Sequence, residues 1–309
     1  MPSADYVTVD VFTTERFAGN PLAVVPDARG LTDRQMQQIA TEFNYSESTF
    51  VLPPEDPANT ARVRIFTPTT EIPFAGHPNV GTAFVLGQQT SLFGEPTGAQ
   101  LNGPLRFEEL AGLVEVDLLR EDHRVLGATI RAPRPLELGD TLAADLVARC
   151  ASIDPSDVLT QPRPPVIGSV GLPFALVELQ SLEALGKARP DLDAFHEATA
   201  SHPREGGDFS LFLYVRSTEN PWHIRARMFA PLDNVPEDPA TGSASGALAA
   251  LLASSDPAQD GEIRMTIEQG VEMGRRSIIE LEVVKHVGVV TDVRITGRCV
   301  QVMRGSIAL

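Results

Sequence analysis

Cysteine is scarce in this chain of 309 residues, which contains only Cys150 and Cys299. Neither lies in a Cys-x-x-Cys pair or close to a histidine in the sequence. Two cysteines do not make a disulfide framework, and free cysteine is among the most buried residue types. We therefore expect both thiols to be reduced and buried.

Basic segments and long apolar runs are also lacking. The net charge is 25 − 41 = −16, which argues against nucleic acid and anionic membrane surfaces as partners. A small anionic substrate is still compatible, because it responds to the local field of a cleft. No apolar run approaches the roughly 18 residues of a membrane span, and residues 1–11 lack the basic-then-apolar pattern of a signal peptide. We expect a cytoplasmic protein.

Signatures of cofactors and metals are missing as well. The glycine-spaced segment 270–277 does not match a phosphate-binding loop and is better interpreted as a turn. The histidines other than His77 show no metal-ligand spacing. The sequence does not exclude a Ser-His-Asp triad, but it has no Gly-x-Ser-x-Gly elbow. We expect neither a metal nor a cofactor, which leaves proton transfer by side chains.

One stretch of the sequence occurs twice. Residues 62–68 (RVRIFTP) resemble residues 225–231 (RARMFAP), and residues 77–83 (HPNVGTA) resemble residues 238–244 (DPATGSA). The offset is 225 − 62 = 163 for the first pair and 238 − 77 = 161 for the second, so one connecting loop differs by two residues. A single repeat of such long period predicts a duplicated domain and not a solenoid. The chain is long enough for two domains.

Each copy predicts a strand, a loop and a helix. The Arg-x-Arg-apolar-Phe pattern alternates with period two, as a half-buried strand does. A polar residue and a proline then open a helix of small residues, with His77-Pro78 in one copy and Asp238-Pro239 in the other. We expect the prolines at the first helical position and Asp238 as an N-cap. Two such helix starts facing each other across an interdomain cleft would hold a carboxylate.

Glu47 is expected at a junction between a helix and a strand. The helix of residues 32–43 has a capping box of Thr32 and Gln35, and an apolar strand follows at 50–52. A solvated loop carboxylate would be unremarkable here, since Glu is mostly exposed. If burial raises its pKa towards the working pH, however, the same side chain can take a proton from carbon and return it elsewhere.

The second half is rich in strands. A helix is expected from Pro239 to about Ala253, and four further strands are expected at 263–268, 277–284, 287–295 and 299–309. Many strands around few long helices, together with the duplicated core, predict an α+β protein with two similar lobes.

The candidates for chemistry are two carboxylates, one imidazole and three hydroxyls: Glu47, Asp238, His77, Ser46, Thr241 and Ser243. An imidazole and a second carboxylate at facing helix starts could share proton transfer or stabilise developing charge. Plainer interpretations exist, because His77 could be a structural histidine and Asn20 is a usual turn former.

Five segments together resemble the PhzF-like phenazine-biosynthesis family: 17–21 (FAGNP), 46–50 (SESTF), 66–71 (FTPTTE), 74–78 (FAGHP) and 237–244 (EDPATGSA). The resemblance covers nearly the whole chain in the right order. It implies the diaminopimelate-epimerase-like fold, with two pseudo-symmetric lobes that each wrap a mostly antiparallel sheet around a central helix. The first lobe would comprise 1–125 and about 297–309, and the second 126–296. The active site would lie between the two lobes. The resemblance also suggests a homodimer.

The resemblance also implies roles for single residues. Glu47 would be the proton-shuttling acid/base, with His77 and Asp238 as its partners. Further positions would line the substrate site: Asn20, Ser46, Gly76, Gly242 and Ser243. One departure is Asn79, where the family commonly has Thr after His-Pro. We expect this difference to affect substrate contacts and not the proton shuttle.

The best-known activity of the family is the isomerisation of trans-2,3-dihydro-3-hydroxyanthranilate without a metal or cofactor. The resemblance therefore implies an isomerase that moves a proton between carbons of a small carboxylated metabolite. An amino-acid-type epimerase or racemase is an alternative, as is a non-catalytic binding protein of the same fold. The related epimerases use two thiols, and neither cysteine here lies at a helix-start motif.

Overall fold

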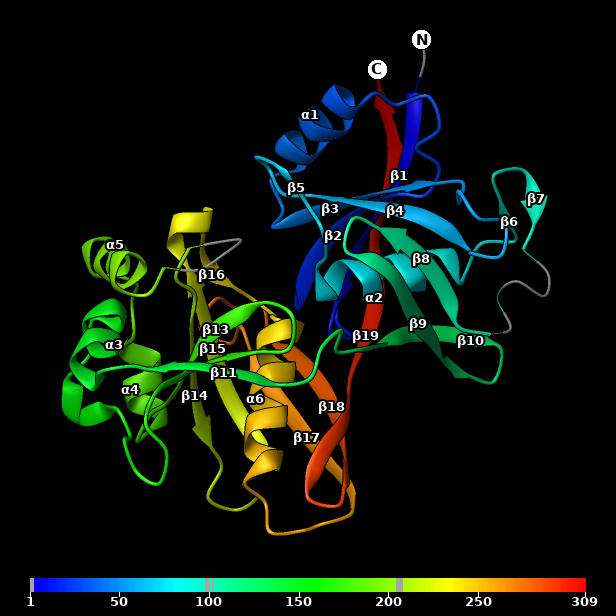
Figure 1. Ribbon diagram of the computed structural model, residues 1–309. Coiled ribbons are helices and arrows are strands. Elements are labelled where there is room, and N and C mark those ends of the chain that lie inside the picture. The colour runs from blue at the N-terminus through cyan, green and yellow to red at the C-terminus, as the bar shows by residue number, and fades with distance from the viewer. Residues whose placement is uncertain (1–2, 98–100, 102, 204–207) are drawn as a thin grey trace. The chain divides into compact units, whose positions relative to one another are not determined.

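The structure, a computed structural model, describes residues 3–97, 101, 103–203 and 208–309. The chain divides into two compact units. Unit 1 comprises Met1–Arg131 and Thr296–Leu309, and unit 2 comprises Ala132–Ile295. Both units combine helices with mostly antiparallel strands (Figure 1).

The sheet of unit 1 begins with β1 (Ser3–Val11), which pairs antiparallel with β2 (Asn20–Val25) and with the end of β19 (Val289–Ala308). β2 pairs parallel with β3 (Glu47–Leu52), and β3 pairs antiparallel with β4 (Ala61–Phe66). The parallel pair aligns the start of β3 with β2, since Glu47 lies opposite Leu22.

The rest of this sheet extends from β4. β4 pairs antiparallel with β5 (Glu71–Ile72) and parallel with β8 (Leu105–Glu109). An antiparallel run then continues through β9 (Gly112–Glu121) to β10 (Arg124–Arg131). A separate short hairpin is formed by β6 (Ser91–Leu92) and β7 (Glu95–Pro96).

Helix α2 (Gly76–Leu86) is the buried centre of unit 1. All 11 of its residues are buried, and it packs against β1, β2, β3, β9 and β10. Gly81 allows this close approach, because a Cβ there would lie 2.6 Å from Leu22 Cδ2 and 2.8 Å from Val11 Cγ2. A helix that is apolar all round requires such a surrounding.

Helix α1 (Asp33–Phe43) covers part of the same unit. Thr32 and Gln35 form the predicted capping box, and Asn44 ends the helix in the left-handed region with φ 52°. Its buried face, centred on Met36, joins a cluster of core residues with Phe50. The prediction of this helix from its caps and its apolar spacing is confirmed.

Unit 2 repeats the pairing pattern of unit 1. Its strands are β11 (Glu137–Thr141), β12 (Val166–Ser169), β13 (Pro173–Glu178), β14 (Leu211–Arg216), β15 (His223–Ala230), β16 (Val235–Asp238), β17 (Gly261–Gln269) and β18 (Ser277–His286). β12 pairs antiparallel with β13, β13 pairs parallel with β14, and β14 pairs antiparallel with β15. β15 then pairs antiparallel with β16 and parallel with β17, and β17 pairs antiparallel with β18. The duplicated sequence stretches thus begin in equivalent strands, β4 and β15.

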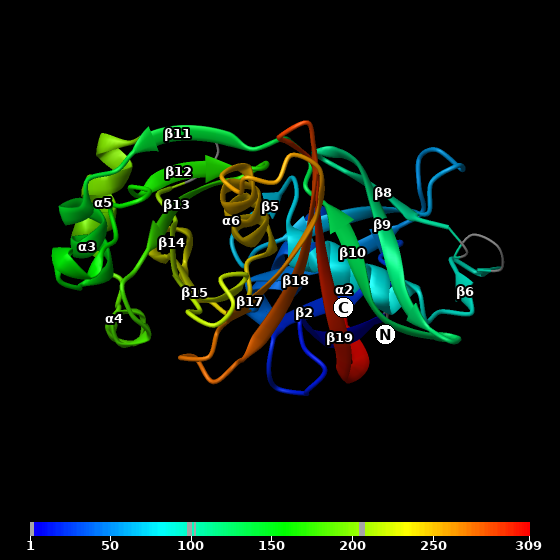
Figure 2. The ribbon, with the colours of Figure 1, turned by 90° about the horizontal axis from the view of Figure 1, so that it is seen from below.

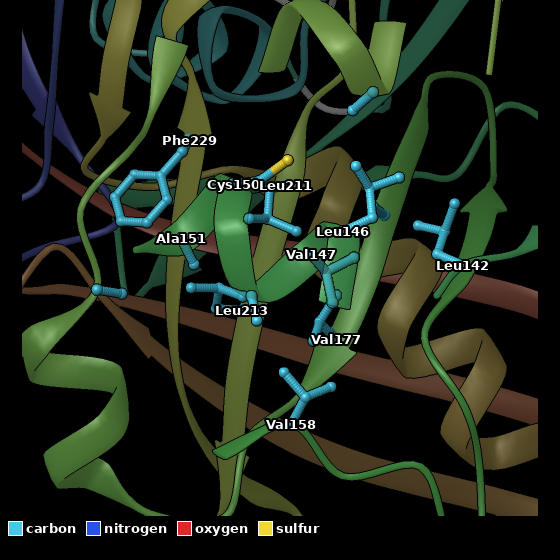
Figure 3. Close-up of a cluster of buried hydrophobic side chains, with 14 of the residues drawn as sticks. Leu142, Leu146, Val147, Cys150, Ala151, Val158, Val177, Leu211, Leu213 and Phe229 are labelled. Carbon is cyan, nitrogen blue, oxygen red and sulfur yellow. The ribbon is translucent and has the colours of Figure 1, made fainter. Parts of the chain in front are cut away.

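Helix α6 (Gly242–Ser254) is the buried helix of unit 2 and packs against β12, β13, β17 and β18 (Figure 2). A second core lies under α3 (Ala144–Ala151), α4 (Leu182–Lys187) and α5 (Leu192–Ser201). Figure 3 shows Val147 and Cys150 of α3 gathered with Leu211 and Leu213 of β14. Two short 3₁₀ turns, Pro155–Asp157 and Pro231–Asp233, complete the unit.

The predicted helix starts were wrong. Helix α2 begins at Gly76 after Ala75, so Pro78 takes the third helical position, where its missing N–H also has no helical partner. Helix α6 begins at Gly242 after Thr241. Asp238 is therefore not an N-cap but the last residue of β16. Proline disfavours helical backbone in the residue before it, and Asp238 pairs instead with β15.

The strands predicted at 287–295 and 299–309 are one continuous strand, β19. The intervening Gly297 does not break it. A Cβ at Gly297 would lie 2.6 Å from the Phe12 ring, so this glycine allows a close approach within the sheet.

We expect Gly81→Ala to destabilise unit 1. Overpacking costs about 1–3 kcal/mol, while the better helix propensity of Ala offsets up to about 1 kcal/mol. Gly246→Ala in α6 is the matched control, because its Cβ would lie 3.3 Å from the flexible end of Ile295. Thermal unfolding of the two variants should show a lower midpoint for Gly81→Ala alone; equal midpoints would contradict the role given to Gly81.

Candidate active site

Four of the predicted site residues of unit 1 lie together at the ends of three elements. Asn20 is the first residue of β2, Glu47 the first of β3, and Ser46 immediately precedes it. His77 is the second residue of α2. Because β2 and β3 run parallel, their first residues lie at the same edge of the sheet.

These side chains form a chain of contacts. Ser46 Oγ donates to Asn20 Oδ1 at 3.2 Å, and Asn20 Nδ2 contacts His77 Nδ1 at 3.4 Å. His77 Nε2 lies 3.4 Å from Glu47 Oε2. An amide nitrogen only donates, so Nδ1 accepts and the proton of a neutral imidazole is assigned to Nε2, which faces the carboxyl of Glu47.

His77 is neutral at ordinary pH. Burial lowers the pKa of its imidazole to about 3, because a desolvated ring cannot easily hold a charge. The 3.4 Å contact with Glu47 is therefore not an ion pair at neutral pH. It places an uncharged N–H donor beside a carboxyl group.

Glu47 does not have the setting of a solvated loop residue. Its side chain is 17% exposed, and Oε2 is buried. Some of the side chain is thus accessible while one oxygen faces the imidazole. Such a carboxyl group is partly desolvated and lies beside an uncharged N–H donor.

A second group lies in unit 2 around Asp238. Thr241 Oγ1 donates to Asp238 Oδ2 at 2.5 Å. Gln269 Nε2 donates to the Asp238 carbonyl oxygen at 2.8 Å and to Thr241 Oγ1 at 3.0 Å, while Gln269 Oε1 accepts from the Thr241 N–H at 3.1 Å. The fully buried Gln269 thereby joins the end of β16 to the start of α6.

Gln269 was not among the predicted site residues. The signal for it was its position directly before the glycine-spaced segment 270–277, which was interpreted as a turn. Gly270 has φ 73°, and a Cβ there would lie 2.5 Å from the Arg275 carbonyl oxygen and 2.6 Å from that of Pro239. Only glycine fits this turn, which brings the end of β17 against the segment after Asp238.

The three remaining predicted site residues lie in the first turns of the buried helices. Gly76 opens α2, and Gly242 and Ser243 open α6. The first N–H groups of a helix have no partner within it and attract anions. Gly76 thus adjoins the group around His77, and Gly242 and Ser243 adjoin the group around Asp238.

Asn79 faces the backbone of its own helix. Its side chain is fully buried, and Nδ2 donates to the Ala75 carbonyl oxygen at 3.0 Å. The nearby Glu109 was not recognised in the sequence. Both of its carboxyl oxygens are buried and have no hydrogen-bond partner among the described residues. Burial raises the pKa of Glu109 to about 8, against the opposing effect of the Asn79 side chain.

Both cysteines are free and buried, as predicted. Cys150 lies in α3 and Cys299 in β19. Burial raises the pKa of Cys150 to about 12 and that of Cys299 further. Neither thiol therefore readily forms the thiolate that a thiol-based epimerase needs.

Within the described ranges, His, Cys, Asp and Glu side chains form no cluster of three or more that could hold a metal ion. Among the helices of that same part of the chain, none is long and apolar enough to cross a membrane.

Two curated relatives resemble the chain over most of its length. An uncharacterized isomerase from Mesorhizobium japonicum is 40% identical and covers 99% of each chain. A trans-2,3-dihydro-3-hydroxyanthranilate isomerase from Pseudomonas aeruginosa is 37% identical over 88% of this chain and 87% of its own. These relatives support an isomerase or epimerase in general.

Solved structures resemble the fold. A PhzF-family phenazine biosynthesis protein from Bacillus anthracis has a TM-score of 0.86 at 25% identity and covers 100% of both chains. A hydroxyproline epimerase from Agrobacterium vitis has a TM-score of 0.66 at 14% identity, over 99% of this chain and 93% of that one. The expected kinship with epimerase-like folds is thus confirmed at the level of the whole fold.

The family model described as phenazine biosynthesis-like protein, PhzC-PhzF, matches residues 9–305. This match confirms the resemblance that the sequence motifs indicated. The chain belongs to the PhzC-PhzF family of phenazine biosynthesis-like proteins.

Proposed function

We propose that this protein is a cofactor-independent isomerase that moves a proton between two carbons of a small carboxylated metabolite. The observation that supports this most is the contact of the partly desolvated Glu47 carboxyl with the neutral imidazole of His77. The isomerase names of the relatives support the same reaction class.

In the proposed reaction, the ionised carboxyl of Glu47 removes a proton from one substrate carbon. The electron pair left behind shifts along the conjugated system, and the same carboxyl returns the proton to another carbon. No oxidant or reductant is required, because substrate and product are isomers. A neutral N–H donor such as His77 stabilises negative charge that develops in the transition state.

Asp238 is proposed as the second acid/base group of this reaction. Its Oδ2 is bonded to Thr241, and its backbone is held by Gln269. Such bonds fix the carboxyl group in one orientation, as catalysis requires. We propose that residues near the two groups bind the substrate, its carboxylate being suited to the helix starts: Asn20, Ser46, Gly76, Gly242 and Ser243.

The substrate proposed for testing is trans-2,3-dihydro-3-hydroxyanthranilate, since a relative 37% identical is named as its isomerase. This compound has the carboxylate and the ring carbons that the proposal needs. On the family resemblance we further propose a cytoplasmic homodimer.

An epimerase acting on an amino-acid-like substrate is the second candidate, and the fold likeness to a hydroxyproline epimerase favours it. Two bases would have to act at one stereocentre. The buried cysteines do not suit this task, so Glu47 and Asp238 would have to serve. Exchange at a stereocentre with inversion would support this candidate, whereas tight ligands without turnover would support a binding protein.

Glu47→Gln is expected to abolish exchange of substrate hydrogen with deuterated solvent, because an amide cannot take up the proton. Loss of a general acid/base lowers rates by on the order of 10²–10⁴-fold. The assay is deuterium incorporation into trans-2,3-dihydro-3-hydroxyanthranilate, followed by mass spectrometry. Glu42→Gln, an exposed change on α1, is the control. Exchange at the wild-type rate in Glu47→Gln would remove Glu47 from the mechanism.

His77 is expected to make the protein less stable in acid. Its folded pKa of about 3 lies below the ordinary value of 6.5, so between these values the unfolded chain binds more protons. The stability that the neutral His77 contributes is fully present above pH 6.5. It is lost as the pH is lowered, by up to about 1.4 kcal/mol per pH unit.

Urea unfolding of wild type and His77→Gln at several pH values between 4 and 7 (roughly the window of this linkage) checks this expectation. The variant should show a flatter dependence on pH, whereas His123→Gln, at an exposed position, should retain the wild-type slope. An unchanged slope in His77→Gln would show that the imidazole is not held neutral by burial.

A further inference from the structure

Two arginines at equivalent positions of the repeat each hold a carboxylate with two hydrogen bonds. In β4, Arg64 Nε and Nη2 donate to the two oxygens of Glu71 at 2.7 and 2.6 Å. In β15, Arg227 Nε and Nη2 donate to the two oxygens of Glu237, both at 2.8 Å. The planar guanidinium is the side chain that fits a carboxylate in this way.

The two pairs share their surroundings. Each guanidinium lies over the phenylalanine two residues further on, with Arg64 at 5.1 Å from the Phe66 ring centre and Arg227 at 4.9 Å from that of Phe229. Stacking on a ring face fixes the plane of the guanidinium. The same geometry occurs in both copies of the repeat, so it is a shared feature of the two units and not an accident of one surface.

The copy in unit 2 is the more firmly held. The Arg227 side chain is 3% exposed, against 13% for Arg64. Its Nη1 donates to the carbonyl oxygens of Leu185 and Ala188 at 2.9 and 2.8 Å. The guanidinium therefore joins β15 both to β16 and to the end of α4.

The held carboxylates immediately precede the segments that contain the proposed acid/base groups. Glu237 is the residue before Asp238, and Glu71 stands 77 − 71 = 6 residues before His77. Glu237 and Asp238 are adjacent in strand β16, so holding the Glu237 side chain restrains the backbone from which the Asp238 side chain projects. Gln269 fixes Asp238 from the other side through its carbonyl oxygen.

We propose that Arg227 and Glu237 are a positioning pair, which orients Asp238 without touching the substrate, and that Arg64 and Glu71 are its duplicated counterpart for His77. The inference rests on the proposed function, in which Asp238 is an acid/base group. The orientation of Asp238 can be measured without any substrate. The effect on Asp238 should exceed that on His77, because Glu237 adjoins Asp238 directly.

The alternative is that these are ordinary structural ion pairs. Arg227→Lys distinguishes a positioning pair from an ordinary ion pair, because lysine retains the positive charge but cannot make the two parallel hydrogen bonds. Arg294→Lys is the matched control in the same unit. Arg294 Nη1 also binds a carboxylate, that of Glu282 at 2.7 Å, and thereby joins strand β19 to strand β18.

The experiment uses the full chain labelled with [4-¹³C]aspartate, whose carboxyl carbons report protonation. The Asp238 signal is assigned as the one lost in Asp238→Asn. Its titration is then compared in wild type, Arg227→Lys and Arg294→Lys, together with thermal unfolding of each. We expect the titration midpoint of Asp238 to move by at least about half a pH unit in Arg227→Lys and to stay unchanged in Arg294→Lys. An unchanged Asp238 signal in a folded Arg227→Lys protein would overturn the inference.

Turnover of trans-2,3-dihydro-3-hydroxyanthranilate gives the second readout. Misplacing a catalytic group by about 1 Å can cost on the order of 100-fold in rate, so kcat should fall at least about tenfold in Arg227→Lys while KM changes less. Equal effects on kcat in Arg227→Lys and Arg294→Lys would count against positioning. If wild type itself has no turnover, the proposed function fails, and the ¹³C titration alone decides about the positioning pair.

If Arg227→Lys does not fold, Glu237→Gln replaces it in both measurements. Glutamine accepts one of the two bonds and leaves the rest of the segment intact. Arg64→Lys, at the more exposed copy, then tests the counterpart by the same kinetic comparison. If the titration midpoint of Asp238 in folded Glu237→Gln equals that of wild type, the inference is also overturned.

Discussion

The burial of two apolar helices, α2 and α6, is the constraint on which the rest of the structure depends. Neither has a polar face, and strands contact each of them along its length. The sides of such a helix mostly pack, so free N–H groups are found in its first turn, where they lack helical partners. Gly76, His77, Gly242 and Ser243 lie in these first turns, and Asn20 and Glu47 contact His77 from the starts of two strands.

At each buried helix start, besides Asn79 of α2, a fully buried amide side chain joins separate polar groups. In unit 1, Asn20 joins Ser46 to His77; in unit 2, Gln269 joins Thr241 to the backbone of Asp238. Amides can donate and accept at once, and they remain uncharged at every pH, so they can fix neighbouring polar groups without adding a buried charge. The two units reach this result with different residues from different strands, although their sheets follow the same order.

Much of this architecture could be predicted from local sequence. The capping box of Thr32 and Gln35 and the repeated Arg-x-Arg-apolar-Phe strands were sufficient signals, because each depends on neighbours within one element. The helix starts were misplaced, since the pairing of Asp238 with β15 is a long-range effect that a proline rule does not include. The burial of Glu47 and the raised pKa of Glu109 could not be predicted from the sequence either, because segments distant in the chain desolvate these side chains. The grouping of Asn20, Ser46, Glu47 and His77 came from the family resemblance and not from spacing.

The pairing of the first strand with the last has a consequence for biosynthesis. β1 (Ser3–Val11) finds its partner residues at 299–308, so this pairing forms only after those residues have been synthesised. Until then, one edge of β1 presents unpaired N–H and C=O groups, and such edges invite pairing with other chains. Closing a loop of nearly the whole polypeptide is also slow compared with the local pairing of β17 and β18. The sheet of unit 1 therefore cannot be completed by its amino-terminal segment alone, and one edge of β1 stays unpaired until residues 299–308 have been made.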